Sequence, residues 1–132
     1  MAEIVYEGQQ EILKRFLGIK SNGNLNLHLF TDDRTPELAD TVSNFTEVSG
    51  GGYAEITIPS TDWNVSLDST TVKMVCNEQS FTFTSQIPRI NGYYLTTEDN
   101  LVLIDAKRFS DAPIENYNEG SLAVNLTITI GT

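Results

Sequence analysis

The sequence predicts a mostly β fold: an antiparallel β-sandwich or flattened barrel of about seven to nine strands, with one N-terminal amphipathic α-helix. Two observations predict it. From residue 25 onward, apolar residues recur at every second position, as in Leu122, Val124 and Leu126, which is the period of half-buried strands. Before residue 20, the apolar period is three to four residues, as on one face of a helix. Neither a repeat nor a linker divides the 132 residues, so we expect a single domain spanning residues 1–132.

The helix is expected at about Glu7 to Leu17, where apolar and polar residues occupy opposite faces. Gly18 directly follows the last apolar turn, a position that favours a left-handed cap. We expect the apolar face to pack on the β body, and the alternative is that it seats the protein on a partner. That face consists of Val5, Ile12, Leu13, Phe16 and Leu17.

The strands are expected in segments of alternating hydrophobicity that turn residues separate. In chain order these segments are Leu25–Phe30, Tyr53–Pro59, Trp63–Asp68, Thr71–Cys76, Phe81–Phe83, Tyr93–Thr97, Leu101–Phe109 and Ser121–Ile130. Tyr93–Thr97 and Leu101–Phe109 flank the acidic turn Glu98–Asn100 and are expected to form a hairpin. Residues 32–44 and 110–120 are expected to be loops.

The composition argues against nucleic-acid and membrane partners. Eight Lys and Arg against eighteen Asp and Glu give a net charge of -10, whereas phosphate recognition requires clustered cations. No window approaches the roughly 18 apolar residues of a membrane span, and the first residues do not resemble a secretory signal. We therefore expect synthesis in a cytoplasm. The single cysteine, Cys76, has no partner for an internal disulfide and is expected to pack in the core.

No set of residues predicts catalysis, so we expect neither an enzyme nor a cofactor. His28 is the single histidine and lies on the strand face opposite three leucines, so it is either exposed or directed into a second layer. No nucleophile motif accompanies it. One histidine and one cysteine do not supply the three or four ligands of a zinc site. Calcium remains an alternative, because Asp32–Asp33 and Glu98–Asn100 offer oxygen ligands, although without an EF-hand spacing.

Glycines, aromatic residues and one arginine are the candidates for contact with a partner. The glycine run after Ser49 is expected to be a flexible joint or a bulge, and it lacks the Lys-Ser/Thr pair of a phosphate loop. Exposed aromatic residues suit contact with protein or sugar, although aromatic residues in strand-rich proteins usually pack in the core. We expect partner contacts at Arg34, Gly50, Gly51, Gly52, Trp63 and Tyr117.

Three segments carry a resemblance to known proteins. They are EGQQEILKRFLG near the N-terminus, then LNLHLFTDDRTPELADTVSNFTEVSGGGYAEITI with Trp63 shortly after it, and finally GYYLTTEDNLVLIDAKRF before the last alternating strand. Together they resemble small virion structural proteins of tailed bacteriophages, over nearly the full chain. The resemblance rests on turns and core residues and assigns no functional residues. It implies a small β-rich protein that coats the capsid, as decoration or cement proteins do, or that belongs to the tail.

The expected function is that of a non-enzymatic virion protein that decorates the outer surface of the capsid. Its expected partners are the major capsid protein or other virion proteins, with self-association through a free edge strand as a further possibility. Such a protein is made in the cytoplasm of the bacterial host and resides in the virion. The alternative function is a tail-fibre or baseplate module that binds a host receptor or glycan.

Overall fold

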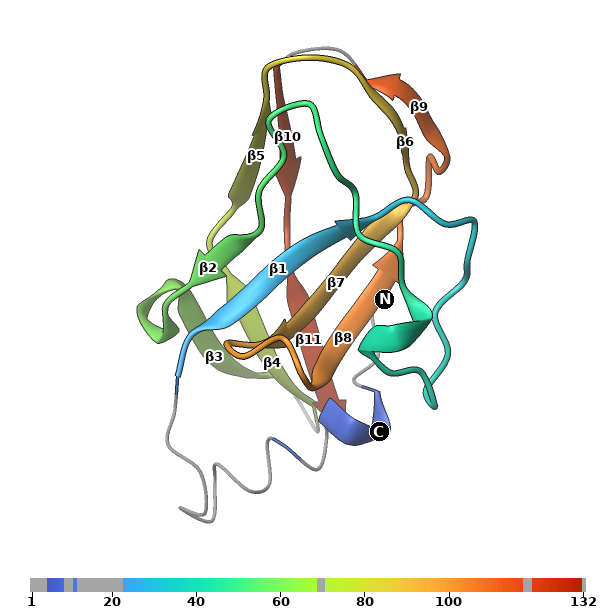
Figure 1. Cartoon of the computed structure of the whole chain (residues 1–132). Coiled ribbons are helices and arrows are strands. Elements are labelled where there is room, and N and C mark those ends of the chain that lie inside the picture. Colours follow the sequence, from blue (N-terminus) through green and yellow to red (C-terminus); the bar gives the residue numbers. More distant parts are fainter. Residues whose placement is uncertain (1–4, 9–10, 12–22, 69–70, 118–119, 132) are drawn as a thin grey trace.

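The protein is mostly β, as the sequence predicts (Figure 1). The computed structural model describes residues 5–8, 11, 23–68, 71–117 and 120–131. Within these ranges there are eleven strands and two short 3-10 helices, η1 (Val42–Asn44) and η2 (Ser60–Asp62). The strands are β1 (Leu25–Phe30), β2 (Ile56–Ile58), β3 (Trp63–Asp68), β4 (Thr71–Cys76), β5 (Gln79–Phe83), β6 (Ile87–Ile90), β7 (Gly92–Thr97), β8 (Leu103–Arg108), β9 (Ile114–Tyr117), β10 (Gly120–Val124) and β11 (Thr127–Gly131).

All strand pairs are antiparallel, and they form four sheets. The largest sheet has the order β2-β1-β7-β8, and the second has the order β11-β4-β3. Two pairs, β10-β5 and β6-β9, complete the set, and these described strands do not close into a barrel. β1 pairs with β7 along its whole length, from Leu25 opposite Thr97 to Phe30 opposite Gly92. β1 and β7 are therefore the centre of the largest sheet.

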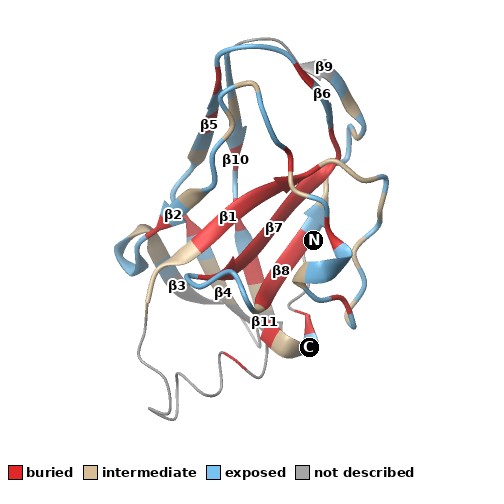
Figure 2. Ribbon diagram, in the orientation of Figure 1, coloured by how far each residue is buried: buried red, intermediate tan, exposed pale blue. Residues whose placement is uncertain are grey.

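The central strands of this sheet are buried on both faces (Figure 2). Every residue of β7 is buried, as are the last five residues of β1 and the first four of β8. An antiparallel sheet more often has one face in water, which would make alternate residues exposed. A second layer of chain must therefore cover the outer face.

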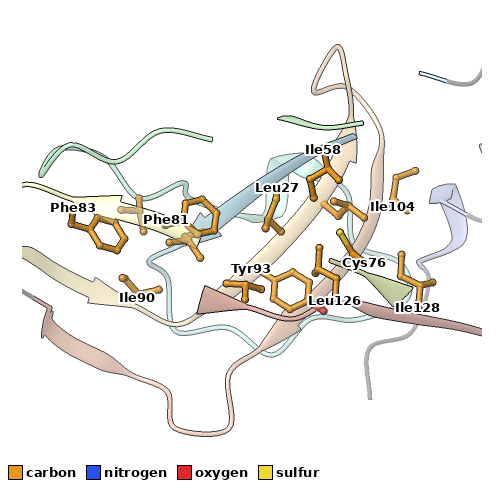
Figure 3. Close-up of a cluster of buried hydrophobic side chains, with 14 of the residues drawn as sticks. Leu27, Ile58, Cys76, Phe81, Phe83, Ile90, Tyr93, Ile104, Leu126 and Ile128 are labelled. Carbon is orange, nitrogen blue, oxygen red and sulfur yellow. The ribbon is translucent and has the colours of Figure 1, made fainter. Parts of the chain in front are cut away.

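The inner face of the sheet packs against residues from the other three sheets (Figure 3). Because side chains alternate along a strand, Leu27 and Leu29 of β1 point into this cluster together with Leu95 of β7. Burying one such aliphatic side chain contributes roughly 1.5–3 kcal/mol. The other fully or nearly fully buried members include Ile58, Cys76, Phe81, Phe83, Ile87, Ile90, Tyr93, Ile104, Leu126 and Ile128.

The outer face carries a second apolar cluster, which the segment after β1 covers. Phe45 from this segment contacts Phe30 of β1 and stacks on Tyr94 of β7, each at 5.1 Å between ring centroids. A backbone hydrogen bond from the Val48 amide to the Leu29 carbonyl (2.9 Å) fastens the end of the segment to β1, and a second from the Thr31 amide to the Thr46 carbonyl (2.9 Å) joins the two ends of the segment. We call residues 31–48 the covering segment. Because the covering segment packs over this second apolar cluster, the outer face of the sheet is buried as well.

The N-terminal turn packs on β8, as the sequence predicts for the start of its helix. Residues 6–8 and Glu11 are helical, and the rest of the helix expected at Glu7 to Leu17 lies outside the described residues. Gly8 contacts the backbone of Ile104 so closely that a Cβ atom would not fit. The Leu103 amide donates a hydrogen bond to the Glu7 carboxylate (2.6 Å). This turn covers β8, an edge strand of the largest sheet.

The expected hairpin of β7 and β8 is confirmed, whereas the last strand is not continuous. The alternation predicts one long strand over Ser121–Ile130, but the segment divides into β10, which pairs with β5, and β11, which pairs with β4. At the division, the Leu126 carbonyl accepts a hydrogen bond from the Cys76 amide (3.0 Å). The loop expected over residues 110–120 contains β9, which pairs with β6. These short pairings explain why eleven strands replace the seven to nine that the sequence predicts.

The glycine run is an ordered turn and not a flexible joint. Gly50, Gly51 and Gly52 have φ angles of 80°, 60° and 82°, a region that residues with a Cβ atom rarely adopt. The Gly51 carbonyl accepts a hydrogen bond from the Thr84 amide (2.8 Å). A Cβ atom on Gly51 would collide with the Ile87 side chain, whereas one on Gly50 would meet open space.

The two glycines should therefore differ in their tolerance of alanine. Gly50→Ala adds only backbone strain, about 1 kcal/mol. Gly51→Ala adds the same strain plus overpacking against Ile87, for a total loss of roughly 2–4 kcal/mol. Urea unfolding of both variants measures the difference, and equal losses would contradict the packed turn.

Asp105 is a buried carboxylic acid in the core. It lies on β8 opposite Leu95 and has no exposed surface. Burial raises its pKa from the usual 3.8 to about 7, while the Ala106 amide and the Tyr93 hydroxyl offset part of this shift. Because the folded state holds this proton more tightly than the unfolded state, the contribution of Asp105 to stability falls as the pH rises from about 4 to 7.

Asp105→Asn should remove this pH dependence. Relative to the wild type, the variant should gain stability between pH 4 and pH 8, by at most on the order of 4 kcal/mol. Denaturant unfolding across this pH range measures the gain, with Asp111→Asn as the control at an exposed carboxylate. A difference between wild type and Asp105→Asn that stays constant with pH would show that Asp105 is ionised throughout.

Candidate functional site

A polar cluster lies around His28 on the outer face of the largest sheet. The leucines of β1 point inward, so the alternation directs His28 to the second layer, where it is 2% exposed. Its ring stacks on Tyr94, with 4.5 Å between centroids and 14° between planes. The sequence left open whether His28 is exposed or turned to a second layer, and the covering segment explains the second arrangement.

Both ring nitrogens of His28 have partners. Nδ1 lies 2.8 Å from Oε2 of Glu47, and Nε2 lies 2.9 Å from the hydroxyl of Thr96. The same oxygen of Glu47 accepts a hydrogen bond from the Tyr53 hydroxyl (2.6 Å), which in turn accepts one from the Leu29 amide (3.0 Å). Burial and the Glu47 carboxylate raise the pKa of Tyr53, so its phenol remains protonated and is a hydrogen-bond donor.

Glu55 completes the cluster on the solvent side. One oxygen of its exposed carboxylate accepts a hydrogen bond from the Asn100 side chain (3.4 Å). One ring nitrogen of His28 and one carboxylate oxygen each from Glu47 and Glu55 all lie within 4.8 Å of one another. The Glu47 side chain is 36% exposed, so a buried imidazole forms the floor of the cluster and two carboxylates form its rim. We call these three residues the His28 cluster.

Amide and hydroxyl groups around His28 hold its neighbours in place. The Asn26 amide donates to the Glu98 carbonyl (3.1 Å) and to Oδ1 of Asn100 (2.8 Å). The Thr57 hydroxyl donates to Oδ1 of Asn26 (2.9 Å). These bonds determine which atom of the Asn26 and Asn100 side-chain amides is the acceptor. Asn100 itself occupies a left-handed turn position, with a φ angle of 63°.

The geometry does not support nucleophilic catalysis at His28. Among the described residues, the hydroxyl in hydrogen-bond range of the imidazole belongs to Thr96, which has no exposed surface. A substrate carbonyl has no approach to a nucleophile at that depth. The arrangement can instead bind a cation or a proton between the imidazole and the carboxylates.

Arg34, a predicted contact residue, stabilises the covering segment. Its guanidinium forms an ion pair with the buried Asp40 and lies 5.6 Å from the centroid of the Phe45 ring. The Asp40 carboxylate raises the pKa of Arg34, which remains charged. Arg108 donates a hydrogen bond to the Arg34 carbonyl (3.4 Å). The Arg34 side chain is 28% exposed, so a minor part of its surface faces solvent.

The remaining predicted contact residues fall into two separate regions. Gly51 and the backbone of Tyr117 are both neighbours of Ile87, and the Tyr117 side chain lies outside the described residues. Trp63 begins β3, where it packs partly buried against the core. Figure 1 places β3 at the lower end of the molecule and the β6-β9 pair at the upper end. The structure thus brings the glycine turn close to β9 but does not unite these residues with Trp63.

The acidic turns that suggested calcium use their carboxylates within the protein. Asp32 accepts a hydrogen bond from the Thr46 amide (3.1 Å), and Asp33 forms an ion pair with Arg108. Asp99 accepts hydrogen bonds from the Thr97 hydroxyl (2.6 Å) and the Leu101 amide (3.0 Å), which closes the turn between β7 and β8.

The single cysteine, Cys76, is buried in the core, as the sequence predicts. Burial raises the pKa of its thiol.

Sequence reasoning missed Glu47, Tyr53 and Glu55 as neighbours of His28. The spacing of Tyr53 and Glu55 shows only that they share a face of one extended segment. Glu47 reaches His28 because the covering segment returns to β1, where Glu47 forms an isolated bridge opposite Phe30. No local sequence pattern predicts that return.

Comparisons with protein families, with curated proteins and with solved structures found no match for this chain. In the part of the chain that the structure describes, no helix has the length and apolar character needed to cross a membrane.

The Tyr53 hydroxyl should contribute measurably to the free energy of unfolding, because it joins Glu47 to the backbone of β1. Tyr53→Phe leaves the Leu29 amide without its acceptor and should cost roughly 1–3 kcal/mol. Tyr6→Phe is the matched control, since Tyr6 is 57% exposed, and its effect should be within about 0.5 kcal/mol. Chemical unfolding of both variants compares them, and indistinguishable stabilities would mean that the hydroxyl contributes nothing.

Proposed function

We propose that this protein is a non-enzymatic structural protein of a tailed-bacteriophage virion, bound to the outer surface of the capsid as a decoration or cement protein. The observation that carries the proposal is that polar groups able to take part in a reaction are instead buried or bonded to other groups of the protein, where they stabilise the fold. His28 is held from both nitrogens, Arg34 is paired with Asp40, and Thr96 is fully buried. The resemblance of the three sequence segments to virion proteins supplies the class of particle.

The arrangement of the sheets supports a sandwich-like body for this role. The largest sheet and the β11-β4-β3 sheet both contribute side chains to the same core, which suits two layers packed face to face. A net charge of -10 favours docking on a basic region of a partner. We propose that the major capsid protein or another virion protein provides this region.

The glycine turn is the proposed docking element. Its backbone is fixed by the Thr84 and Tyr53 amides, so it presents one shape without a large entropic cost of ordering on binding. Ser49 beside the turn and Gly50 within it are exposed, and a Cβ atom at Gly50 would meet no atom of the described protein within 4 Å. Arg34 stabilises the covering segment that leads to this turn, through its ion pair with Asp40.

Binding to particles that lack the protein tests this proposal. Ser49→Arg places a bulky cation beside the glycine turn and should weaken binding to capsids at least tenfold. Ser60→Arg makes the same change at an exposed position of η2, near β3, and should leave binding unchanged. Imaging of the particle should locate the protein on the capsid shell.

The tail-fibre or baseplate alternative predicts different results. The protein would then localise to the tail, and Ser60→Arg would be the variant that loses binding. Because Trp63 is the single tryptophan, a glycan bound there would change the fluorescence of the protein. Absence of the protein from purified virions would contradict both functions.

A further inference from the structure

We propose that the His28 cluster binds a divalent transition-metal ion of the zinc type, through Nδ1 of His28 and one carboxylate oxygen each of Glu47 and Glu55. The ion would join β1, the end of the covering segment and the extended chain before β2. This site is independent of the proposed virion function, since it concerns how the covering segment is held and not what the protein docks on.

The first argument is the placement of hydrogens around Thr96. Its hydroxyl lies 3.0 Å from the Thr97 carbonyl and 3.0 Å from Oδ1 of Asn100, and both of these oxygens are acceptors. The Thr96 hydroxyl has one hydrogen. When this hydrogen points to one of these two oxygens, Nε2 of His28 donates to Thr96, and Nδ1 of the neutral imidazole has a lone pair and no hydrogen. When it points to Nε2 instead, Nδ1 carries the hydrogen and donates to Glu47.

In the first of these tautomers, the lone pair of Nδ1 faces a second acceptor. Nδ1 lies 2.8 Å from Oε2 of Glu47, and this oxygen already accepts the Tyr53 hydroxyl hydrogen. In the tautomer that has its hydrogen on Nε2, two acceptors at this distance require either a proton or a metal ion.

The second argument is the convergence of Glu55 on the same point. A proton would satisfy the contact between His28 and Glu47, whereas a third ligand atom within 4.8 Å is what a metal ion uses. The ion pairs described for arginine residues join Arg34 to Asp40, Arg89 to Glu115 and Arg108 to Asp33. None of these pairs brings a guanidinium to the two glutamates of the His28 cluster.

The ligand types indicate the ion. An imidazole nitrogen with two carboxylate oxygens suits zinc and similar ions better than calcium, which prefers six to eight oxygen ligands. Each ligand has a supporting hydrogen bond, from His28 to Thr96, from Tyr53 to Glu47 and from Asn100 to Glu55. The exposed rim leaves a fourth position for water, so the ion should exchange with solvent.

Titration of the chelator-treated full-length protein with Zn²⁺, followed by calorimetry, tests the site. We expect one ion per chain and a rise in the melting temperature, because an ion that binds only the folded state stabilises it. Glu55→Gln should weaken Zn²⁺ binding about tenfold to a hundredfold without preventing folding, since Glu55 is exposed. Glu78→Gln, at an exposed glutamate between β4 and β5, is the matched control and should bind as the wild type does.

Nitrogen NMR of the imidazole gives a second readout, because His28 is the single histidine. Zn²⁺ should shift the Nδ1 resonance while Nε2 keeps its hydrogen. The proposal is overturned if Zn²⁺ does not bind, if Glu78→Gln weakens binding as much as Glu55→Gln, or if Ca²⁺ binds more tightly than Zn²⁺. The absence of Zn²⁺ binding would mean that a proton alone joins His28 to Glu47.

Discussion

The structure depends on the burial of β1 and β7 on both faces. The inner face is covered by the other sheets, and the outer face is covered by residues 31–48 together with the N-terminal turn. Phe45 stacks on Tyr94, and the Val48 amide is bonded to Leu29, so the covering segment belongs to the core although it contains little regular structure. This second layer determines which polar groups of β1 are removed from water.

The environment of His28 follows from that burial. A buried imidazole needs partners for both nitrogens, and Thr96 and Glu47 provide them from the neighbouring strand and from the covering segment. Tyr53 and Glu55 are brought to the same place because the chain turns at the glycines and then enters β2. The same return of the chain therefore explains both the ordered glycine turn, which we propose as the docking element, and the convergence of ligands, which we propose as a metal site.

Much of the fold could be predicted from alternation, whereas the site could not. The alternation of Leu25, Leu27 and Leu29 predicts β1 and its inner face, and the turn at Glu98–Asn100 predicts the β7-β8 hairpin. The change of partner near Leu126 leaves the alternation intact, so the sequence cannot reveal the division into β10 and β11. Glu47 meets His28 through an isolated bridge within a loop, and pairing of that kind depends on tertiary packing and leaves no periodic signal.

Amide hydrogen exchange tests most directly whether the covering segment is part of the core. If it is, the amides of Thr31 and Val48, which bond Thr46 and Leu29, should exchange only when the whole protein unfolds, at the rate of the slowest amides in β7. Exchange of these two amides orders of magnitude faster, while β1 and β7 remain protected, would show that the segment opens separately. In that case His28 would be exposed to water for part of the time, and neither its fixed hydrogen bonds nor the ligand geometry built on them would hold.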